Sequence, residues 1–191
     1  KAFESGPNGH VDLPAFENLV FTQKVIEPEH YDSDYFVSDW RQAGNDYTIE
    51  TRRKIEGRHP QVIKEVFQPK RVLDLGCGPG ALMFLLQEVG IAADGVDFAP
   101  SSRELAPAEV RDRITIGPVA EPSMPDSAYD LVICREVFEH LTVLQVRECA
   151  RNICRISSKF AYVTTRFHPN PATLLDVTTQ FDVDPSHITL L

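Results

Sequence analysis

The sequence lacks any long apolar run, and it lacks several other common signals. No stretch approaches the roughly 18 consecutive apolar residues of a membrane-spanning helix, and the first residues lack the pattern of a signal peptide. No segment is repeated and none is of low complexity. These absences argue against membrane-spanning, secreted and repeat proteins. We therefore expect a cytoplasmic protein without membrane contact.

The sequence also lacks a cysteine pairing pattern and an excess of basic residues. The cysteines form neither a C-x-x-C pair nor a zinc spacing, so we expect reduced, structural thiols. With 19 Lys and Arg against 28 Asp and Glu, the net charge is −9. Such a field disfavours nucleic acid as a partner. We expect the basic cluster at 52–54 to be a solvated helix face, and Arg147, Arg151 and Arg155 to form an exposed stripe. The four cysteines are Cys77, Cys134, Cys149 and Cys154.

Short apolar runs alternate with helical patterns along most of the chain. Periodicity predicts helices from Asn45 to Phe67, broken near Gly57 and Pro60, and from a Thr142 cap to Ile156. Ser101 or Ser102 is expected to cap a further, weak helix. The alternation predicts an α/β fold with a doubly wound, mostly parallel sheet and ligands at the carboxyl ends of its strands. The expected strands are 72–75, 91–97, 113–117, 129–134 and 160–165.

The chain divides into an N-terminal arm and one domain. Residues 1–44 carry little periodic signal, but 31–40 concentrate aromatic residues in a polar background. Two interpretations stay open for them: a cap over the edges of the core, or a lid over a substrate pocket. Residues 45–191 are expected to form the cofactor-binding domain.

A glycine-rich turn follows the first strand and opens a helix. Gly76, Gly78 and Gly80 let the backbone approach a ligand closely, as in nucleotide-type cofactor sites. Asp97 lies 21 residues after Gly76, where an acid takes ribose hydroxyls. These features fit NAD and S-adenosylmethionine equally. Asp74 suits an ammonium group and Pro79 lacks the N–H that a pyrophosphate turn needs, which argues against an NAD-dependent oxidoreductase.

Three segments, residues 74–80, 95–101 and 129–141, resemble the class I S-adenosylmethionine-dependent methyltransferases. The resemblance spans about residues 45–165 and implies a Rossmann-like fold. It places Asp97 on the ribose and Phe98 against the adenine, with Asp74 and the glycines on the methionine moiety. The cofactor-binding residues it implies are Asp74, Gly76, Gly78, Gly80, Asp97, Phe98 and Arg135.

Two departures from the family pattern stand out. Where the family often has an Asp near the adenine amine, residues 117–119 are Gly-Pro-Val, so we expect adenine contacts from the backbone or from Glu121. The family usually closes its sheet with a further helix and two antiparallel strands. The 26 residues after Thr165 are too few for all of these. We expect a C-terminal part that is incomplete and a sheet without its last edge strands.

Chemistry beyond cofactor binding is predicted where the fourth strand ends. Glu136, Glu139 and His140 share one side if the chain turns helical there, and we assign the catalytic role to His140 and Glu136. This E-x-x-E-H pattern resembles metal-assisted small-RNA 2′-O-methyltransferases and ubiquinone-pathway O-methyltransferases. With His187, preferred over His168, the three would bind Mg²⁺ or Mn²⁺. The alternative is His140 as a metal-free base or a structural residue.

The sequence thus predicts an S-adenosylmethionine-dependent methyltransferase that acts on a hydroxyl of a small-molecule or sugar-containing acceptor. The alternatives are a 2′-O-methyltransferase acting on RNA, and a non-catalytic cofactor-binding module in a larger assembly. A partner protein or a homodimer stays open. Arg166, after the fifth strand, is interpreted either as a site for an anionic acceptor or as the partner of a loop carboxylate.

Overall fold

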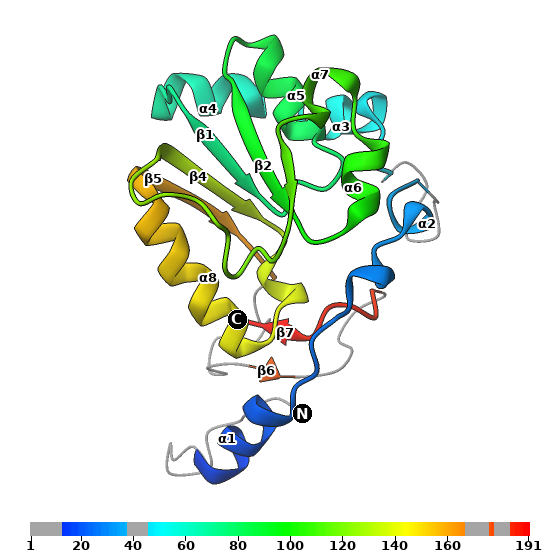
Figure 1. Ribbon diagram of the computed structural model, residues 1–191, viewed down its shortest axis with the longest axis vertical. Coiled ribbons are helices and arrows are strands. Elements are labelled where there is room, and N and C mark those ends of the chain that lie inside the picture. The colour runs from blue at the N-terminus through cyan, green and yellow to red at the C-terminus, as the bar shows by residue number, and fades with distance from the viewer. Residues whose placement is uncertain (1–12, 38–45, 167–175, 178–183) are drawn as a thin grey trace.

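A five-stranded parallel sheet forms the centre of the molecule (Figure 1). The computed structural model describes residues 13–37, 46–166, 176–177 and 184–191. The strand order is β3-β2-β1-β4-β5, so the chain first winds outward from β1 to β3 and then returns to the other side of β1. The strands are β1 (Val72–Leu75), β2 (Ala93–Asp97), β3 (Ile114–Ile116), β4 (Tyr129–Arg135) and β5 (Ser157–Thr164).

Both faces of the sheet are covered by apolar helices. In β1 and β4 almost every residue is buried, because alternate side chains enter two separate cores. Leu73 and Val132 pack on one face against α8 (Val143–Ile156). Val72 and Leu131 pack on the other face with α4 (His59–Phe67) and α5 (Ala81–Glu88). This two-sided burial produces the continuous apolar runs in the sequence.

Smaller helices complete the fold. Two of them, α3 and α4, meet at Gly57, where φ is +52°, and Pro60 lies in the first turn of α4. The remaining elements are α1 (Leu13–Thr22), η1 (Pro28–His30), α2 (Ser33–Val37), α3 (Ile49–Glu56), α6 (Pro100–Leu105), α7 (Ala108–Arg111), η2 (Phe138–His140), β6 (Asp176–Val177) and β7 (Thr189–Leu190).

The predicted strands and the long helix are confirmed with bounds shifted by up to three residues, and the helix near Ser101 needs a correction. All five strands and the long helix are present, and Thr142 caps α8 in a capping box with Gln145. Neither Ser101 nor Ser102 caps a helix, because α6 already begins at Pro100. Ser102 instead donates its hydroxyl hydrogen bond to Asp97 at 2.6 Å.

Residues from both ends of the described chain lie at the carboxyl edge of the sheet (Figure 1). Gln23 joins them: its Nε2 donates to the Ile188 carbonyl and to Thr189 Oγ1, both at 2.8 Å. Its Oε1 accepts from the Val143 amide at 2.9 Å. The short antiparallel pair β6–β7 stands apart from the main sheet, whose edge strands in the described part of the chain are β3 and β5.

The predicted arm, the membrane prediction and the cysteine prediction can each be compared with the described residues only. The boundary between arm and domain at residue 44 falls within 38–45, outside the described residues, as does Trp40. Within the described ranges, no helix is both long enough and apolar enough to cross a bilayer. All four cysteines are free, and three of them are buried.

Candidate functional site

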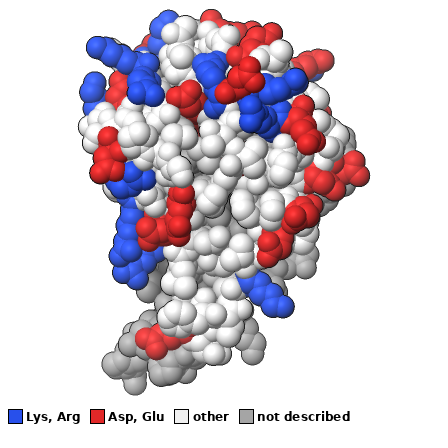
Figure 2. Space-filling model, viewed as in Figure 1, with Lys and Arg blue, Asp and Glu red and all other residues white. Residues whose placement is uncertain are grey.

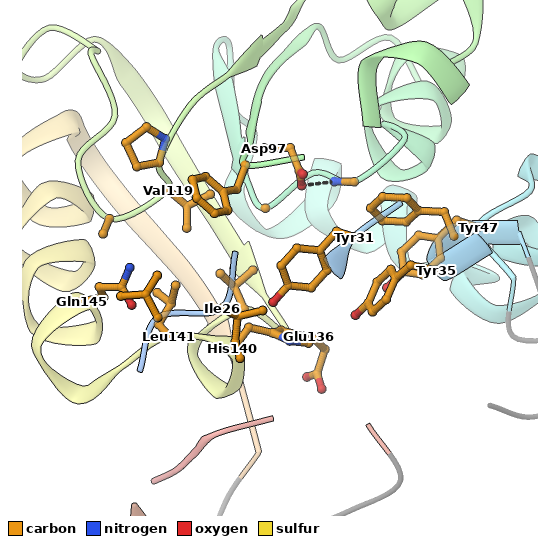
Figure 3. A pocket seen from close by; sticks show the side chains of 18 residues that line it. Ile26, Tyr31, Tyr35, Tyr47, Asp97, Val119, Glu136, His140, Leu141 and Gln145 are labelled. Atoms are coloured by element: carbon orange, nitrogen blue, oxygen red, sulfur yellow. Dashed lines mark hydrogen bonds between the residues drawn. The ribbon is translucent and has the colours of Figure 1, made fainter. Parts of the chain in front are cut away.

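A pocket of about 760 Å³ opens at the carboxyl ends of the strands (Figure 3). It joins the glycine turn, the ends of β2 and β4, and the N-terminal segment. Figure 3 shows Tyr31 between Asp97 on one side and the turn carrying Glu136 and His140 on the other. The lining residues are Val25, Ile26, Tyr31, Tyr35, Phe36, Tyr47, Gly76, Gly78, Asp97, Phe98, Pro118, Val119, Ala120, Glu136, Val137, His140, Leu141 and Gln145.

The glycine turn is closed in by its neighbours on several sides. Gly76 has φ of +76°, and a Cβ there would lie 2.3 Å from Val137 Cγ2, so only glycine fits. At Gly78 a Cβ would come within 3.4 Å of the Phe36 ring. Gly80 does not line the pocket but begins α5 with φ of +75°. The turn therefore has the close backbone packing expected of a ligand-binding loop.

Asp97 closes β2 and faces the glycine turn. Its Oδ2 accepts from the Gly78 amide at 2.8 Å, and its Oδ1 accepts from the Ala99 amide at 3.0 Å and from Ser102. Burial raises the pKa of Asp97, and these hydrogen bonds oppose that rise. Phe98 follows it in the pocket wall. The predicted ribose and adenine residues are thus adjacent and face the same space.

Asp74 and Arg135 lie behind this wall and do not line the pocket. Burial raises the pKa of Asp74 to about 7, against the positive charge of Arg135. Arg135 Nη1 donates to Glu56 Oε2 at 3.0 Å, and the same oxygen contacts His59 Nδ1 at 2.7 Å. Sequence reasoning did not identify Glu56 and His59, because they come from α3 and α4 and no motif links them to the turn.

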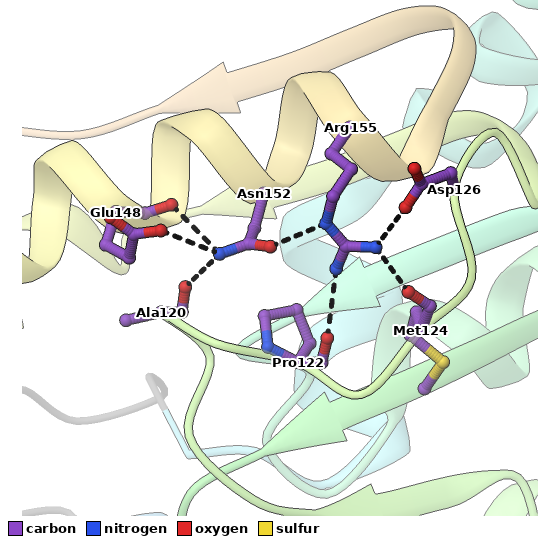
Figure 4. A network of polar contacts seen from close by, with 7 residues as sticks. All are labelled: Ala120, Pro122, Met124, Asp126, Glu148, Asn152 and Arg155. Carbon is purple, nitrogen blue, oxygen red and sulfur yellow. Dashed lines mark hydrogen bonds and ion pairs between the residues drawn. The ribbon is translucent and has the colours of Figure 1, made fainter.

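The loop after β3 forms the remaining wall, through residues 118–120. Asn152 Nδ2 donates to the Ala120 carbonyl at 2.9 Å, and Arg155 Nη1 donates to the Met124 carbonyl at 2.7 Å (Figure 4). The sequence predicted that Arg155 belongs to an exposed stripe, and this is wrong. Arg155 instead bonds the loop to α8. Glu121 is exposed and does not line the pocket, which leaves residues 118–120 facing it.

The turn after β4 is not an α-helix. Glu136 has φ of +52°, and a single 3₁₀ turn, η2, follows at Phe138–His140. Glu136 is half-exposed and lies 3.8 Å from Arg166 Nε. This contact matches the interpretation of Arg166 as the partner of a loop carboxylate. The predicted helical spacing of the E-x-x-E-H residues is thus wrong, although they remain close together.

Three of the four predicted metal ligands converge. One ligand atom each of Glu139, His140 and His187 lies within 4.8 Å of the others, and Glu136 is not in this group. The rings of His140 and His187 are 4.6 Å apart. Burial, followed by the charge of Glu136, raises the pKa of Glu139 to about 8. His168, the rejected candidate, lies outside the described residues.

Glu139 is held by contacts on both sides. Its Oε2 accepts from the Thr165 hydroxyl at 3.0 Å, and its backbone carbonyl accepts from the Ile188 amide at 2.7 Å. Its side chain is almost fully buried, and Oε1 has no hydrogen-bond donor among the residues that the structure describes. A buried carboxylate oxygen without a donor beside two imidazoles is the arrangement that a divalent cation satisfies.

Aromatic rings of the N-terminal segment cover this region. Five rings form a series of edge-to-face contacts, in which each ring packs against the next. The centroid distances are 5.2 Å for Tyr47–Phe36, 5.1 Å for Phe36–Tyr35, 4.9 Å for Tyr35–Tyr31 and 5.7 Å for Tyr31–His140. Three of these rings come from the aromatic segment 31–40, and Tyr31, Tyr35 and Phe36 line the pocket, so cap and lid both remain interpretations of that segment. The signal in the sequence was the density of aromatic residues in a polar background.

Comparisons with known proteins complete the description. The model of the protein family described as "Methyltransferase domain" matches residues 47–179. The ubiquinone biosynthesis O-methyltransferase of Bordetella avium is 34% identical over 91 residues, covering 44% of this chain and 38% of that protein. The mitochondrial counterpart of Schizosaccharomyces pombe is 31% identical over 89 residues, covering 41% and 31%. The chain thus spans less than two fifths of either relative.

A solved structure shows the same fold. The crystal structure of an S-adenosylmethionine-dependent methyltransferase from Archaeoglobus fulgidus superimposes with a TM-score of 0.56 and 24% identity. The match covers 76% of this chain and 68% of that protein. At this identity the likeness concerns the arrangement of the sheet and helices, which agrees with the strand order given above.

Proposed function

The chain belongs to the methyltransferase domain family, and from that premise we propose that it transfers a methyl group from S-adenosylmethionine to a hydroxyl of a small-molecule acceptor. One observation carries the proposal. A single pocket joins the glycine turn and Asp97, at one end, to His140 and the tyrosines at the other. Cofactor and acceptor would therefore meet in one continuous pocket, as a direct transfer requires.

The cofactor end fits S-adenosylmethionine. Asp97 would accept hydrogen bonds from the ribose hydroxyls once its carboxylate exchanges the Gly78 amide for them, and Phe98 would pack on the adenine. Gly76 and Gly78 line the pocket and would face the cationic methionine end, while Asp74 and Gly80 do not line it and would act from behind the turn. Arg135 would act from behind, through its charge on Asp74. When bound, the cofactor supplies an activated methyl group on a sulfonium, so that positioning is the main task of the protein.

The acceptor end fits a divalent cation such as Mg²⁺ or Mn²⁺. Glu139, His140 and His187 would hold it, since Glu139 Oε1 is buried without a donor among the described residues. Such a cation would lower the pKa of an acceptor hydroxyl. Glu136 is more exposed, would not bind the cation, and would remain in its ion pair with Arg166 at the edge of the site. If no cation binds, His140 would itself take the proton.

The acceptor is proposed to be small. The names of the relatives support a hydroxyl acceptor, and the mostly apolar and aromatic lining of the pocket beside His140 suits a small ligand. On the face shown in Figure 2, acidic and basic side chains of the described residues are interspersed, and these residues form no extended basic surface there for an RNA backbone.

Calorimetric titration with S-adenosylmethionine tests the cofactor site. We expect binding to wild type and a loss of at least about 100-fold in affinity in Asp97→Ala, because both ribose hydroxyls lose their acceptor. Asp94→Asn is the matched control, since Asp94 lies on the same strand but bonds the Tyr129 hydroxyl at 2.9 Å, away from the pocket. Equal affinity in Asp97→Ala and wild type would refute the assignment.

An acceptor screen with methyl-labelled cofactor, with and without Mg²⁺ or Mn²⁺, tests the transfer. Labelling of small hydroxylated compounds supports the proposal. If only RNA is labelled, the acceptor is RNA and the proposed small-molecule acceptor is wrong. If the cofactor binds and no compound is labelled, the domain is a non-catalytic cofactor-binding module.

A further inference from the structure

A chain of two hydrogen bonds reaches His140 from behind. His140 Nδ1 lies 2.8 Å from Ser186 Oγ, and Ser186 Oγ donates to Asp184 Oδ1 at 2.6 Å. The Ser186 amide donates to the same carboxylate oxygen at 3.0 Å. Ser186 is fully buried and Asp184 is 2% exposed. Neither of them lines the pocket.

The direction of these bonds determines where the proton of His140 lies. A serine hydroxyl has a single hydrogen, and the hydrogen bond to the Asp184 carboxylate uses it. Toward His140, Ser186 Oγ can then only accept, so Nδ1 must carry a hydrogen. In the neutral ring the lone pair is left on Nε2.

The same carboxylate also faces the second histidine of the cluster. Asp184 Oδ2 lies 3.6 Å from His187 Nε2, and it accepts from the Tyr35 hydroxyl at 3.3 Å. His30 Nε2 approaches Oδ1 at 4.0 Å. Asp184 therefore contacts His187 directly and His140 through Ser186, and the N-terminal segment holds it from the other side.

We propose that Asp184 and Ser186 are positioning residues that select the Nδ1–H tautomer of His140 and orient both histidines of the cluster. The inference rests on the proposed function for its catalytic meaning. A histidine that acts as base or ligand through one nitrogen needs the other nitrogen held by a hydrogen bond, or the two tautomers and ring orientations compete. Asp184 and Ser186 provide that support without touching the reactants.

The first test reads the tautomer directly and needs no turnover. Two-bond ¹H–¹⁵N spectra of protein labelled at histidine distinguish Nδ1–H from Nε2–H, and loss of a signal set in His140→Gln assigns the ring. We expect Nδ1–H in wild type and a mixed or Nε2–H pattern in Ser186→Ala. Ser158→Ala is the matched control, since the Ser158 hydroxyl donates to the Tyr129 carbonyl at the amino ends of β4 and β5, away from the pocket. An Nε2–H tautomer in wild type would overturn the proposal.

The second test is kinetic. Ser186→Ala and Asp184→Asn are expected to lower kcat about 10- to 100-fold, with KM for S-adenosylmethionine changed less than about twofold, because Asp97 is untouched. An unchanged kcat in folded Ser186→Ala would contradict the positioning role. If Asp184→Asn does not fold, the tautomer of wild type still decides. Wild type that shows Nδ1–H but methylates no acceptor would contradict the proposed function and still support the hydrogen-bond chain.

Discussion

Tyr31 packs edge-on against His140, with ring centroids 5.7 Å apart. The contact joins residues 109 positions apart along the chain (140 minus 31) and places an aromatic ring from the N-terminal segment beside the candidate base. Ser101 holds the same segment by donating to the Tyr31 carbonyl. The N-terminal segment is thus part of the site itself rather than an appendage to the domain.

We expect Tyr31→Ala to raise KM for the acceptor about tenfold, because a ring that lines the pocket and orders His140 is removed. Tyr31→Phe keeps the ring and should leave KM within about twofold of wild type. Steady-state kinetics on an acceptor from the screen measure both. Equal KM values in Tyr31→Ala and wild type would show that the ring covers the sheet edge only.

Gln23→Leu should destabilise the contacts between the N-terminal segment, α8 and residues 188–189 without destabilising the sheet. It removes three hydrogen bonds that join the N-terminal segment to α8 and to residues 188–189. Each is worth about 1 kcal/mol, so losing all three should make local opening on the order of 100-fold more frequent. Hydrogen exchange should then accelerate at 184–190 and stay constant at β1 and β4. Uniform acceleration across the sheet would instead mean global destabilisation.

Glu139→Gln should weaken Mn²⁺ binding at least tenfold, because it removes the buried anionic ligand. In wild type the pKa of Glu139 is about 8, so the cation must displace a proton at neutral pH, and affinity should increase as the pH rises from 6 to 8. Calorimetry or Mn²⁺ resonance spectra measure both effects. Glu136→Gln is the control and should have a smaller effect. Methyl transfer that withstands EDTA and Glu139→Gln alike would exclude the metal.

Glu56 should make the fold sensitive to acid. Burial opposes ionisation of Glu56, but hydrogen bonds from His59 and Arg135 outweigh it and lower the pKa from 4.5 to about 2. A depressed carboxyl pKa contributes stability above the unfolded value, and that stability is lost as the pH falls from about 4.5 to 2. The shift corresponds to about 3 kcal/mol.

Urea unfolding between pH 6 and 2.5 measures this contribution. Glu56→Gln should be less stable than wild type at pH 6 and should approach it at pH 2.5. Glu50→Gln is the control, because Glu50 is exposed and pairs only with a neighbouring lysine on its own helix among the contacts of the described chain. A constant difference between Glu56→Gln and wild type across the range would contradict the pKa argument.

Local patterns in the sequence were enough to predict the sheet and the cofactor end of the site. Apolar runs such as 72–75 reveal buried parallel strands, and a glycine turn with an acid at the end of the next strand implies the positions of Gly76 and Asp97. Each of these signals depends on neighbours within about 20 residues. The strands were therefore predicted with bounds within about three residues of those observed, and Asp97 lies in the pocket wall as expected.

The acceptor end could not be predicted in the same detail. The helical spacing assumed for Glu136, Glu139 and His140 fails because Glu136 adopts a positive φ and a 3₁₀ turn follows. The bond from His140 to Ser186 spans 46 residues, and no periodicity reports such a contact. Arg155 was taken for a solvated residue because spacing alone does not reveal the carbonyls that it reaches.

Gln23 and Ile188, 165 positions apart, are joined by a hydrogen bond, and this has a consequence for the synthesis of the chain on the ribosome. The sheet has all five of its parallel strands once Thr164 has emerged. His187 and the segment that Gln23 holds emerge later. A chain synthesised only as far as Thr164 would thus contain the five strands and the glycine turn but not His187, so the cluster at Glu139 can be completed only after the residues of the sheet are in place.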